Sequence, residues 1–518
     1  LTVQVQPSLA ASALTRLEAL ELSPRPSAEE VVSAFLPNLM INRALQAAGI
    51  EDSALQAELD RQITRALQYL YSAQKADGGW GWYLRDRSDV TVTAYALIGL
   101  AEAQAQGIPV DEGVMINAQR FVRTGFIVPG LDMPRSLMNR QALVLYALAR
   151  SGAPDEGRAA TLFDSRDQIA LYAQALLAQT LAISDPNDPR IATLLDNLAR
   201  SAIVSANGVH WEEAQQDRFN WNTDTRTTAI VLDTFARLRP QSELIPGIVR
   251  WLNAVRRVDG WETRQETAWA LMALGSAATA LGEDFTSATD VCVRFGGTAL
   301  LGCAPPLTLS GIQTAVAESG VNLTEATPLD IAADGGRLYY TAQLTSYLPV
   351  PTVEPLNRGI SIERRYTMGV GDDMQTIGAA CVGDTITVRL TIIAPNALNY
   401  VIVEDPIPAG TDAVNPDLAI SEQIGTRPEL SREDPLSQGW GWWWFSNIEF
   451  RDDRVVLSAS YLPAGTYEFV YSIRAGLPGV YNVIPATARE AYFPEVFGRS
   501  AGLSFEIGTE GGDNCPTS

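Results

Sequence analysis

Histidine and cysteine, the side chains that most often hold metals, are scarce in this chain. Among 518 residues there is one histidine, His210. The four cysteines, Cys292, Cys303, Cys381 and Cys515, show no Cys-x-x-Cys spacing, which a structural zinc site normally has. This scarcity excludes a His-rich metal site and a zinc centre, and we expect neither a metal nor a cofactor.

Basic residues are also few: 38 Lys and Arg stand against 60 Asp and Glu, which gives a net charge of −22. Nucleic acid and anionic membrane surfaces both select a basic footprint, so neither is an expected partner. No apolar run approaches the ~20 residues of a transmembrane helix. The acidity itself mainly indicates solubility.

The chain begins at Leu1, with neither an initiator Met nor a signal peptide. We therefore expect a piece of a longer protein whose N-terminal part is missing. An anchor in that missing part is the one expected route to a membrane.

The sequence patterns of common catalytic sites are absent. There is no Gly-x-Ser-x-Gly motif and no phosphate-binding loop. Residues 86–89 (Asp-Arg-Ser-Asp) and 222–225 (Asn-Thr-Asp-Thr) lack the Asp-x-Asp-Asp crowding that raises a carboxyl pKa, so we interpret them as helix N-caps. Glu29 and Glu30 are neighbours that point about 100° apart on a helix, so they do not face each other as an acid–base pair. We expect no catalytic residue and no enzyme.

The first half of the chain, residues 9–283, has the periodicity of helices joined by loops that carry Gly, Pro, Asp and Asn. Ala-rich faces in this half permit close packing between helices. About eleven or twelve helices of this kind are typical of an α/α toroid of stacked hairpins. The clearest helical segments are 55–74, 90–106, 137–150, 168–183, 189–203, 225–238 and 263–281.

The second half changes to β-strand patterns. Residues 1–6 also alternate like a strand, and they are too few to stand alone, so they should pair with a later strand. Residues 285–350 contain short strand-like runs, and from about residue 358 polar and apolar residues alternate without intervening helices. Such spacing predicts an antiparallel β-sandwich over residues 353–508. Residues 509–518 are polar and are expected to form a flexible tail.

Two aromatic features allow a functional and a structural interpretation. Gly and Trp recur between helices at residues 78–82, 208–211 and 260–261, either as an aromatic binding rim or, the interpretation we favour, as loop packing that repeats with the hairpins. Residues 439–445, Gly-Trp-Gly-Trp-Trp-Trp-Phe, form either a strand on a core, the favoured interpretation, or an exposed contact surface.

The stretch from Ser23 to Pro37 opens the helical half. Ser27 is a candidate N-cap, and Glu30 three residues later would complete a capping box. Pro37 should kink or interrupt the helix, because it lacks an N–H and clashes with the preceding turn.

The same stretch resembles the thioester domain of the α2-macroglobulin and complement-type family. That family carries Gly-Cys-x-Glu-Gln shortly before Phe-Leu-Pro. Anchored on Phe35-Leu36-Pro37, this chain has Ser27 at the Cys position, with Glu29 and Glu30 at the Glu-Gln positions. A thioester forms from a thiol and a carboxamide, so the resemblance implies a family member without the covalent trap.

The resemblance extends over nearly the whole chain. Residues 208–211 and 261–271 resemble the thioester domain, and 400–410, 451–457 and 492–500 resemble the C-terminal macroglobulin domain of bacterial members. The implied fold is an α/α toroid (9–283) inserted into a small CUB-type β-domain (1–8 and 284–352), followed by a β-sandwich (353–508).

The resemblance implies an extracytosolic endopeptidase inhibitor whose missing N-terminal domains meet the target protease and trap it sterically. Tyr492, near the C-terminal motif, is a candidate interface residue. His210, which lies near the thioester in complement-type proteins, is either a candidate interface residue or, the interpretation we favour, a structural loop histidine beside Trp211. The helix start at Ser27 should then pack against the C-terminal domain. The alternative function is a non-enzymatic envelope scaffold or adhesion module.

The cysteines fit a compartment outside the cytosol. Cys292 and Cys303 are close enough in sequence to close a small loop, which contributes roughly 2–3 kcal/mol if oxidised. Cys381 and Cys515 either pair or stay free.

Overall fold

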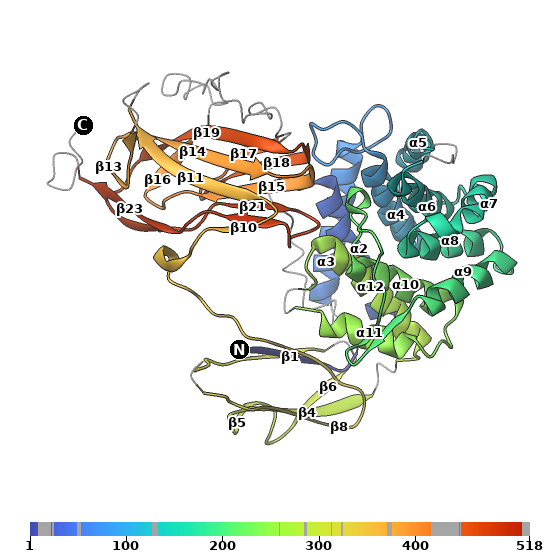
Figure 1. Cartoon of the computed structure of the whole chain (residues 1–518). Helices are drawn as coiled ribbons and strands as arrows, with labels where there is room; N and C mark the ends of the chain where they lie inside the picture. Colours follow the sequence, from blue (N-terminus) through green and yellow to red (C-terminus); the bar gives the residue numbers. More distant parts are fainter. Residues whose placement is uncertain are drawn as a thin grey trace. The chain divides into compact units, whose positions relative to one another are not determined.

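The computed structural model describes residues 1–8, 22, 25–48, 53–126, 133–257, 260–283, 287–311, 313–322, 325–369, 375–415, 445 and 447–509. The chain divides into two compact units, Leu1–Thr345 and Ser346–Ser518. Helices dominate the first unit, and the second is built of strands (Figure 1).

The described part of the first unit contains eleven α-helices. They are α2 (Ala28–Ala48), α3 (Ser53–Ala73), α4 (Val90–Ala105), α5 (Glu112–Arg123), α6 (Arg135–Arg150), α7 (Glu156–Asp164), α8 (Leu171–Ser184), α9 (Pro189–Arg200), α10 (Asp224–Leu238), α11 (Ile245–Ala254) and α12 (Arg264–Ala280).

Alternate helices form a closed ring. Helices α2, α4, α6, α8, α10 and α12 each pack against the next, and α12 packs back against α2. Each intervening helix packs against the ring helix that precedes it. Figure 1 shows α2 to α12 gathered into one body of helices. The sequence explains why some helices lie in the ring and others outside it. Ring helix α4 is buried at every residue from Thr91 to Ala103, whereas the outer helix α9 buries only Ile191, Leu194, Leu195 and Leu198, a single apolar stripe.

The recurring tryptophans pack between the outer and ring helices. Trp80, Trp211 and Trp261 are buried, and each indole N–H donates to a carbonyl near the end of the preceding outer helix, at 2.8, 2.8 and 3.0 Å. Their backbone N–H groups donate to a threonine of the next ring helix: Thr93, Thr228 and Thr267. Loop packing is confirmed, and the interpretation of these three residues as an exposed rim is wrong.

Two local expectations about where helices end are wrong. Pro37 does not interrupt α2, which continues to Ala48, because every side chain from Val31 to Asn42 is buried and packing outweighs the lost N–H. The helix expected over 189–203 ends at Arg200, since Ile203–Ser205 (β2) pairs with Gly208–His210 (β3) in a small hairpin.

The helical segment lies, along the chain, between strands of one sheet. Strand β1 (Thr2–Gln6) pairs with β7 (Ala315–Glu318) and with β9 (Tyr339–Gln343), both antiparallel. The expected later partner of residues 1–6 is therefore confirmed. A second sheet is built from β4 (Ala288–Phe295), β5 (Thr298–Leu301), β6 (Leu307–Ser310) and β8 (Leu329–Asp334).

The described residues of the second unit form three sheets around one apolar core. Among these described strands the pairs are antiparallel except β13 with β23, which are parallel. One sheet is β10 (Leu356–Arg358), β22 (Phe497–Arg499), β21 (Thr487–Glu490), β15 (Leu398–Pro406), β18 (Arg454–Leu462) and β17 (Asn447–Phe450). The others are β12 (Gln375–Thr376), β11 (Ser361–Met368), β14 (Thr385–Ala394), β19 (Gly465–Ala475) and β16 (Thr411–Val414), and β13 (Ala379–Cys381), β23 (Leu503–Gly508) and β20 (Gly479–Val483).

A buried ion pair crosses this second core. Arg364 of β11 and Asp405 of β15 have fully buried side chains and form an ion pair at 2.7 Å. The Tyr471 hydroxyl donates to the other carboxylate oxygen of Asp405 at 2.6 Å. Removing one partner of such a pair leaves a buried charge without compensation.

We expect Asp405→Ala to lower the free energy of unfolding by about 3–5 kcal/mol, because it strands Arg364 in the core. Urea denaturation followed by the β-sheet circular dichroism signal measures this. The matched control is Glu363→Ala, which removes the exposed pair of Glu363 with Arg365 and should cost about 0.5 kcal/mol or less. Equal losses in the two variants would contradict the assignment.

Candidate functional site

The N-terminus of α2 is held by the neighbouring hairpin. The Tyr69 hydroxyl of α3 donates to the Pro26 carbonyl at 2.8 Å, and the Ala28 N–H donates to the Trp82 carbonyl at 2.9 Å. These two bonds fix the backbone on either side of Ser27. Burial, with the nearby charge of Glu30, raises the pKa of Tyr69 to about 12.

Ser27 caps the helix. Its hydroxyl oxygen accepts the Glu30 N–H at 3.0 Å, and its side chain is 4% exposed. The Glu30 carboxylate pairs with Arg264, the first residue of α12, at 2.7 Å. The Ser27 hydroxyl therefore caps α2 locally, whereas the Glu30 carboxylate ties α2 to α12.

Glu29 turns toward a different helix from Glu30. Its carboxylate accepts the Ser33 hydroxyl at 2.5 Å, and Ser33 also lies 3.1 Å from the hydroxyl of Tyr95 on α4. Burial and the charge of Glu29 raise the pKa of Tyr95 well above its ordinary value. The two glutamates thus serve separate contacts, as expected for neighbours on a helix.

A buried polar network inside the ring was not found by sequence reasoning. The Asp217 carboxylate accepts Asn139 at 2.7 Å, the Tyr172 hydroxyl at 2.9 Å and the Asn220 side chain at 2.8 Å. The Arg226 guanidinium is fully buried and lies 5.2 Å from the centre of the Tyr172 ring. No spacing in the sequence marks Asp217, because Asn139 and Tyr172 belong to α6 and α8, far from it along the chain.

Helix N-caps account for the acidic runs, as expected. Asp89 accepts the N–H groups of Thr91 and Val92 at the start of α4, and Thr223 accepts the Arg226 N–H at the start of α10. The Thr223 hydroxyl also donates to Glu266 at 2.5 Å. Glu266 completes a capping box with Thr263 on α12, and burial raises the pKa of Glu266 to about 7.

The remaining expected residues lie elsewhere. His210 stacks on Trp251 with ring centres 4.7 Å apart, and its Nε2 lies 3.1 Å from Glu212. Tyr492 is buried and packs edge-on against Tyr400 in the second unit.

The cysteines are partly accounted for. Cys292 and Cys303 form a disulfide, and Cys381 is also disulfide-bonded. Cys515, the tryptophans at 440 and 442–444, and the tail from residue 510 lie outside the described residues.

Within the described ranges, no group of three or more His, Cys, Asp or Glu is placed to hold a metal ion. None of the described helices is both long enough and apolar enough to cross a membrane.

Family models match both units. The model of the A-macroglobulin TED domain matches residues 145–276, and the model of the Bacterial Alpha-2-macroglobulin MG10 domain matches residues 359–495. The first lies within the helical ring, from α6 to α12, and the second covers most of the β-unit.

Similar proteins cover nearly the whole chain. An alpha-2-macroglobulin homolog of Nostoc sp. is 24% identical over 496 residues, which span 87% of this chain and 24% of the relative. Native Escherichia coli alpha-2-macroglobulin, solved from domain MG7 to the C-terminus, aligns with 98% of this chain and 77% of that structure, with a TM-score of 0.70 and 19% identity. Salmonella alpha-2-macroglobulin reacted with methylamine aligns with 98% of this chain and 31% of its own, with a TM-score of 0.69 and 18% identity.

A ring of helices followed by a macroglobulin β-domain defines a macroglobulin-type protein. The chain belongs to the bacterial α2-macroglobulin family, which confirms the resemblance. This is a family of endopeptidase inhibitors rather than of enzymes. The chain spans about a quarter of the length of curated relatives such as those of Nostoc sp. and Escherichia coli.

Glu266 gives the ring a predictable pH dependence. Its folded pKa of about 7 lies above the ordinary value of 4.5, so the folded state holds the proton more tightly than the unfolded state. This stabilisation is complete below pH 4.5 and is lost as the pH rises to 7. Glu266→Gln keeps a side chain that can cap the helix but does not titrate. From pH 5 to pH 8, the free energy of unfolding of this variant should therefore rise relative to that of wild type by roughly 2–3 kcal/mol.

Urea denaturation at each pH measures the difference between Glu266→Gln and wild type. Glu243→Gln, at an exposed glutamate of the same unit, is the matched control, and its difference from wild type should stay constant. A constant difference for Glu266→Gln as well would show that Glu266 ionises normally in the folded protein.

Proposed function

We propose that this chain is the C-terminal part of an extracytosolic α2-macroglobulin-like endopeptidase inhibitor that traps proteases sterically, without a thioester. The observation that carries the proposal is the identity of the residues at positions 27 and 30, at the start of α2. A thiol and a carboxamide must condense to form a thioester, and this chain offers a hydroxyl at Ser27 and a carboxylate at Glu30. Both groups are engaged in holding the helix.

The domain assignment is part of the same proposal. We assign residues 9–283 to an α/α toroid, 1–8 with 284–352 to a CUB-type β-domain, and 353–508 to the C-terminal macroglobulin domain. The closed ring of alternate helices supports the toroid. The pairing of β1 with β7 and β9, which follow the helices in sequence, supports an insertion.

Trapping needs parts of the protein beyond this chain. We propose that N-terminal domains carry a segment that the target protease cleaves, and that cleavage lets the domains close around the protease. The disulfide between Cys292 and Cys303 supports an oxidising compartment outside the cytosol. That α2 packs against the C-terminal domain, and that His210 or Tyr492 lies at an interface, stays a prediction.

Protease trapped in a cage of domains should still cleave small peptides but not large proteins. We expect the full-length protein, mixed with a broad-specificity protease, to leave peptide hydrolysis intact and to abolish hydrolysis of a large protein. Ser27→Ala should trap as well as wild type, because the hydroxyl has a capping role worth about 1 kcal/mol.

The control is the same protease with its active site blocked. It cannot cleave the full-length protein, so it should stay free and separate from it on gel filtration. Equal inhibition of both substrates, or none, would rule out trapping and favour an envelope scaffold or adhesion module.

A further inference from the structure

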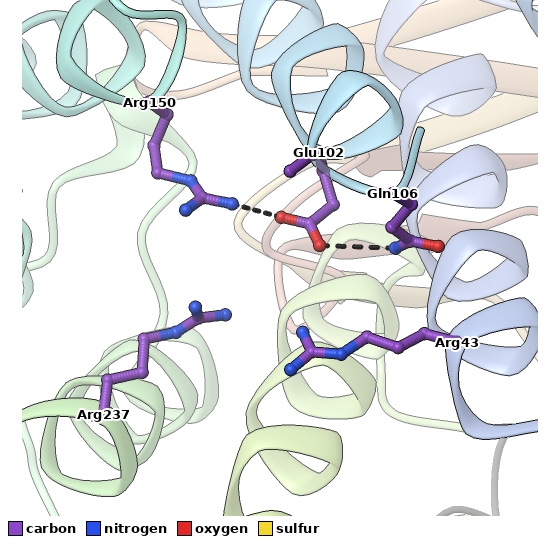
Figure 2. Close-up of a pocket in the computed structure, with 6 residues that line it drawn as sticks. Arg43, Glu102, Gln106, Arg150 and Arg237 are labelled. Atoms are coloured by element: carbon purple, nitrogen blue, oxygen red, sulfur yellow. Dashed lines mark hydrogen bonds and ion pairs between the residues drawn. The ribbon is translucent and has the colours of Figure 1, made fainter. Parts of the chain in front are cut away.

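A cavity of about 470 Å³ lies where the later turns of four ring helices meet. Helices α4, α6 and α10 contribute side chains from their last two turns, and α2 contributes Arg43 (Figure 2). The lining residues are Arg43, Glu102, Ala105, Gln106, Arg150 and Arg237.

Arg237 is held so that its guanidinium group faces this cavity. Its Nε donates to both carboxylate oxygens of Asp233, at 2.8 and 2.9 Å, and the Ser276 hydroxyl fixes Asp233 from α12 at 2.6 Å. The charge of Asp233 raises the pKa of Arg237 further above its ordinary value. Because Nε is engaged, the two Nη groups are left to point into the cavity, as Figure 2 shows.

Glu102, the acidic residue that lines the cavity, is already bonded to neighbouring side chains. Glu102 has one carboxylate oxygen paired with Arg150 and accepts the Gln106 amide on the other at 3.3 Å. Figure 2 shows the Arg43 guanidinium turned toward Arg237 across the cavity. Within the described part of the chain, the Arg43 side chain makes no hydrogen bond or ion pair.

The arginines outnumber the carboxylates that could neutralise them. Arg43, Arg150 and Arg237 face Glu102 and Asp233, which leaves one positive charge in excess inside a chain of net charge −22. Cations at the ends of helices can simply offset the helix dipole, and that accounts for Arg150 and Arg237. It does not account for Arg43, because α2 has no basic residue in its last turn.

We propose that this cavity binds a small oxyanion of the phosphate or polycarboxylate class. Guanidinium forks match phosphate and carboxylate oxygens in geometry and form strong charge-assisted hydrogen bonds with them. The volume falls within the range of small-ligand sites, about 300–1,000 Å³, and exceeds the needs of a single water. The site is separate from the start of α2, so it stands whether or not the protein traps proteases.

Isothermal titration of residues 1–518 with inorganic phosphate, and separately with citrate, tests the proposal. Sodium chloride of equal ionic strength is the reference. We expect saturable binding of at least one of the two probes, and the stronger of them distinguishes phosphate from carboxylate chemistry. Arg43→Gln should weaken that binding roughly tenfold, the effect of losing one charge-assisted contact.

Two further variants separate a binding defect from a folding defect. Arg65→Gln, at an exposed arginine of α3, is the matched control and should bind like wild type. Arg237→Lys keeps a cation beside Asp233 but loses the fork, and it should also bind about tenfold more weakly. No saturable heat with either probe, or unchanged binding in Arg43→Gln or Arg237→Lys, would overturn the proposal.

Discussion

The closure of the helical ring is the constraint on which the first unit depends. Helix α12 returns to α2, and the ion pair of Arg264 with Glu30 joins the N-termini of these two helices. The helices alternate between the ring and its outside, and capping side chains at Ser27, Asp89, Thr223 and Thr263 start four of the six ring helices. The later turns of four ring helices meet at the cavity.

This constraint supports our proposal of a family member without a thioester, because helix packing closes the ring. Ser27 and Glu30 offer a hydroxyl and a carboxylate, which cannot form a thioester. Ser27 caps α2, and Glu30 ties α2 to α12. The Salmonella relative of similar fold was solved after reaction with methylamine. For the present chain we propose a conformational role, in which the ring and the β-domain help to enclose a protease that other domains engage.

Much of the fold follows from local patterns in the sequence. The all-round burial of α4 and the single stripe of α9 are both visible as apolar spacing, and the recurring tryptophans signalled the repeated hairpins. Ser27 was recognisable as a cap from its spacing to Glu30. Sequence-based expectations fail where tertiary packing outweighs local preference. Pro37 stays within α2 because its neighbours are buried. The partners of Asp217 and the arginines of the cavity come from separate helices, so no local spacing could bring them together.

Capture of a protease by the proposed mechanism involves no covalent bond. The most direct measurement mixes the full-length protein with active protease, isolates the complex by gel filtration, and denatures it under reducing conditions. Size separation should then recover the whole protease at its own mass, because neither Ser27 nor Glu30 can acylate it. A protease adduct that survives denaturation and reduction would contradict the account.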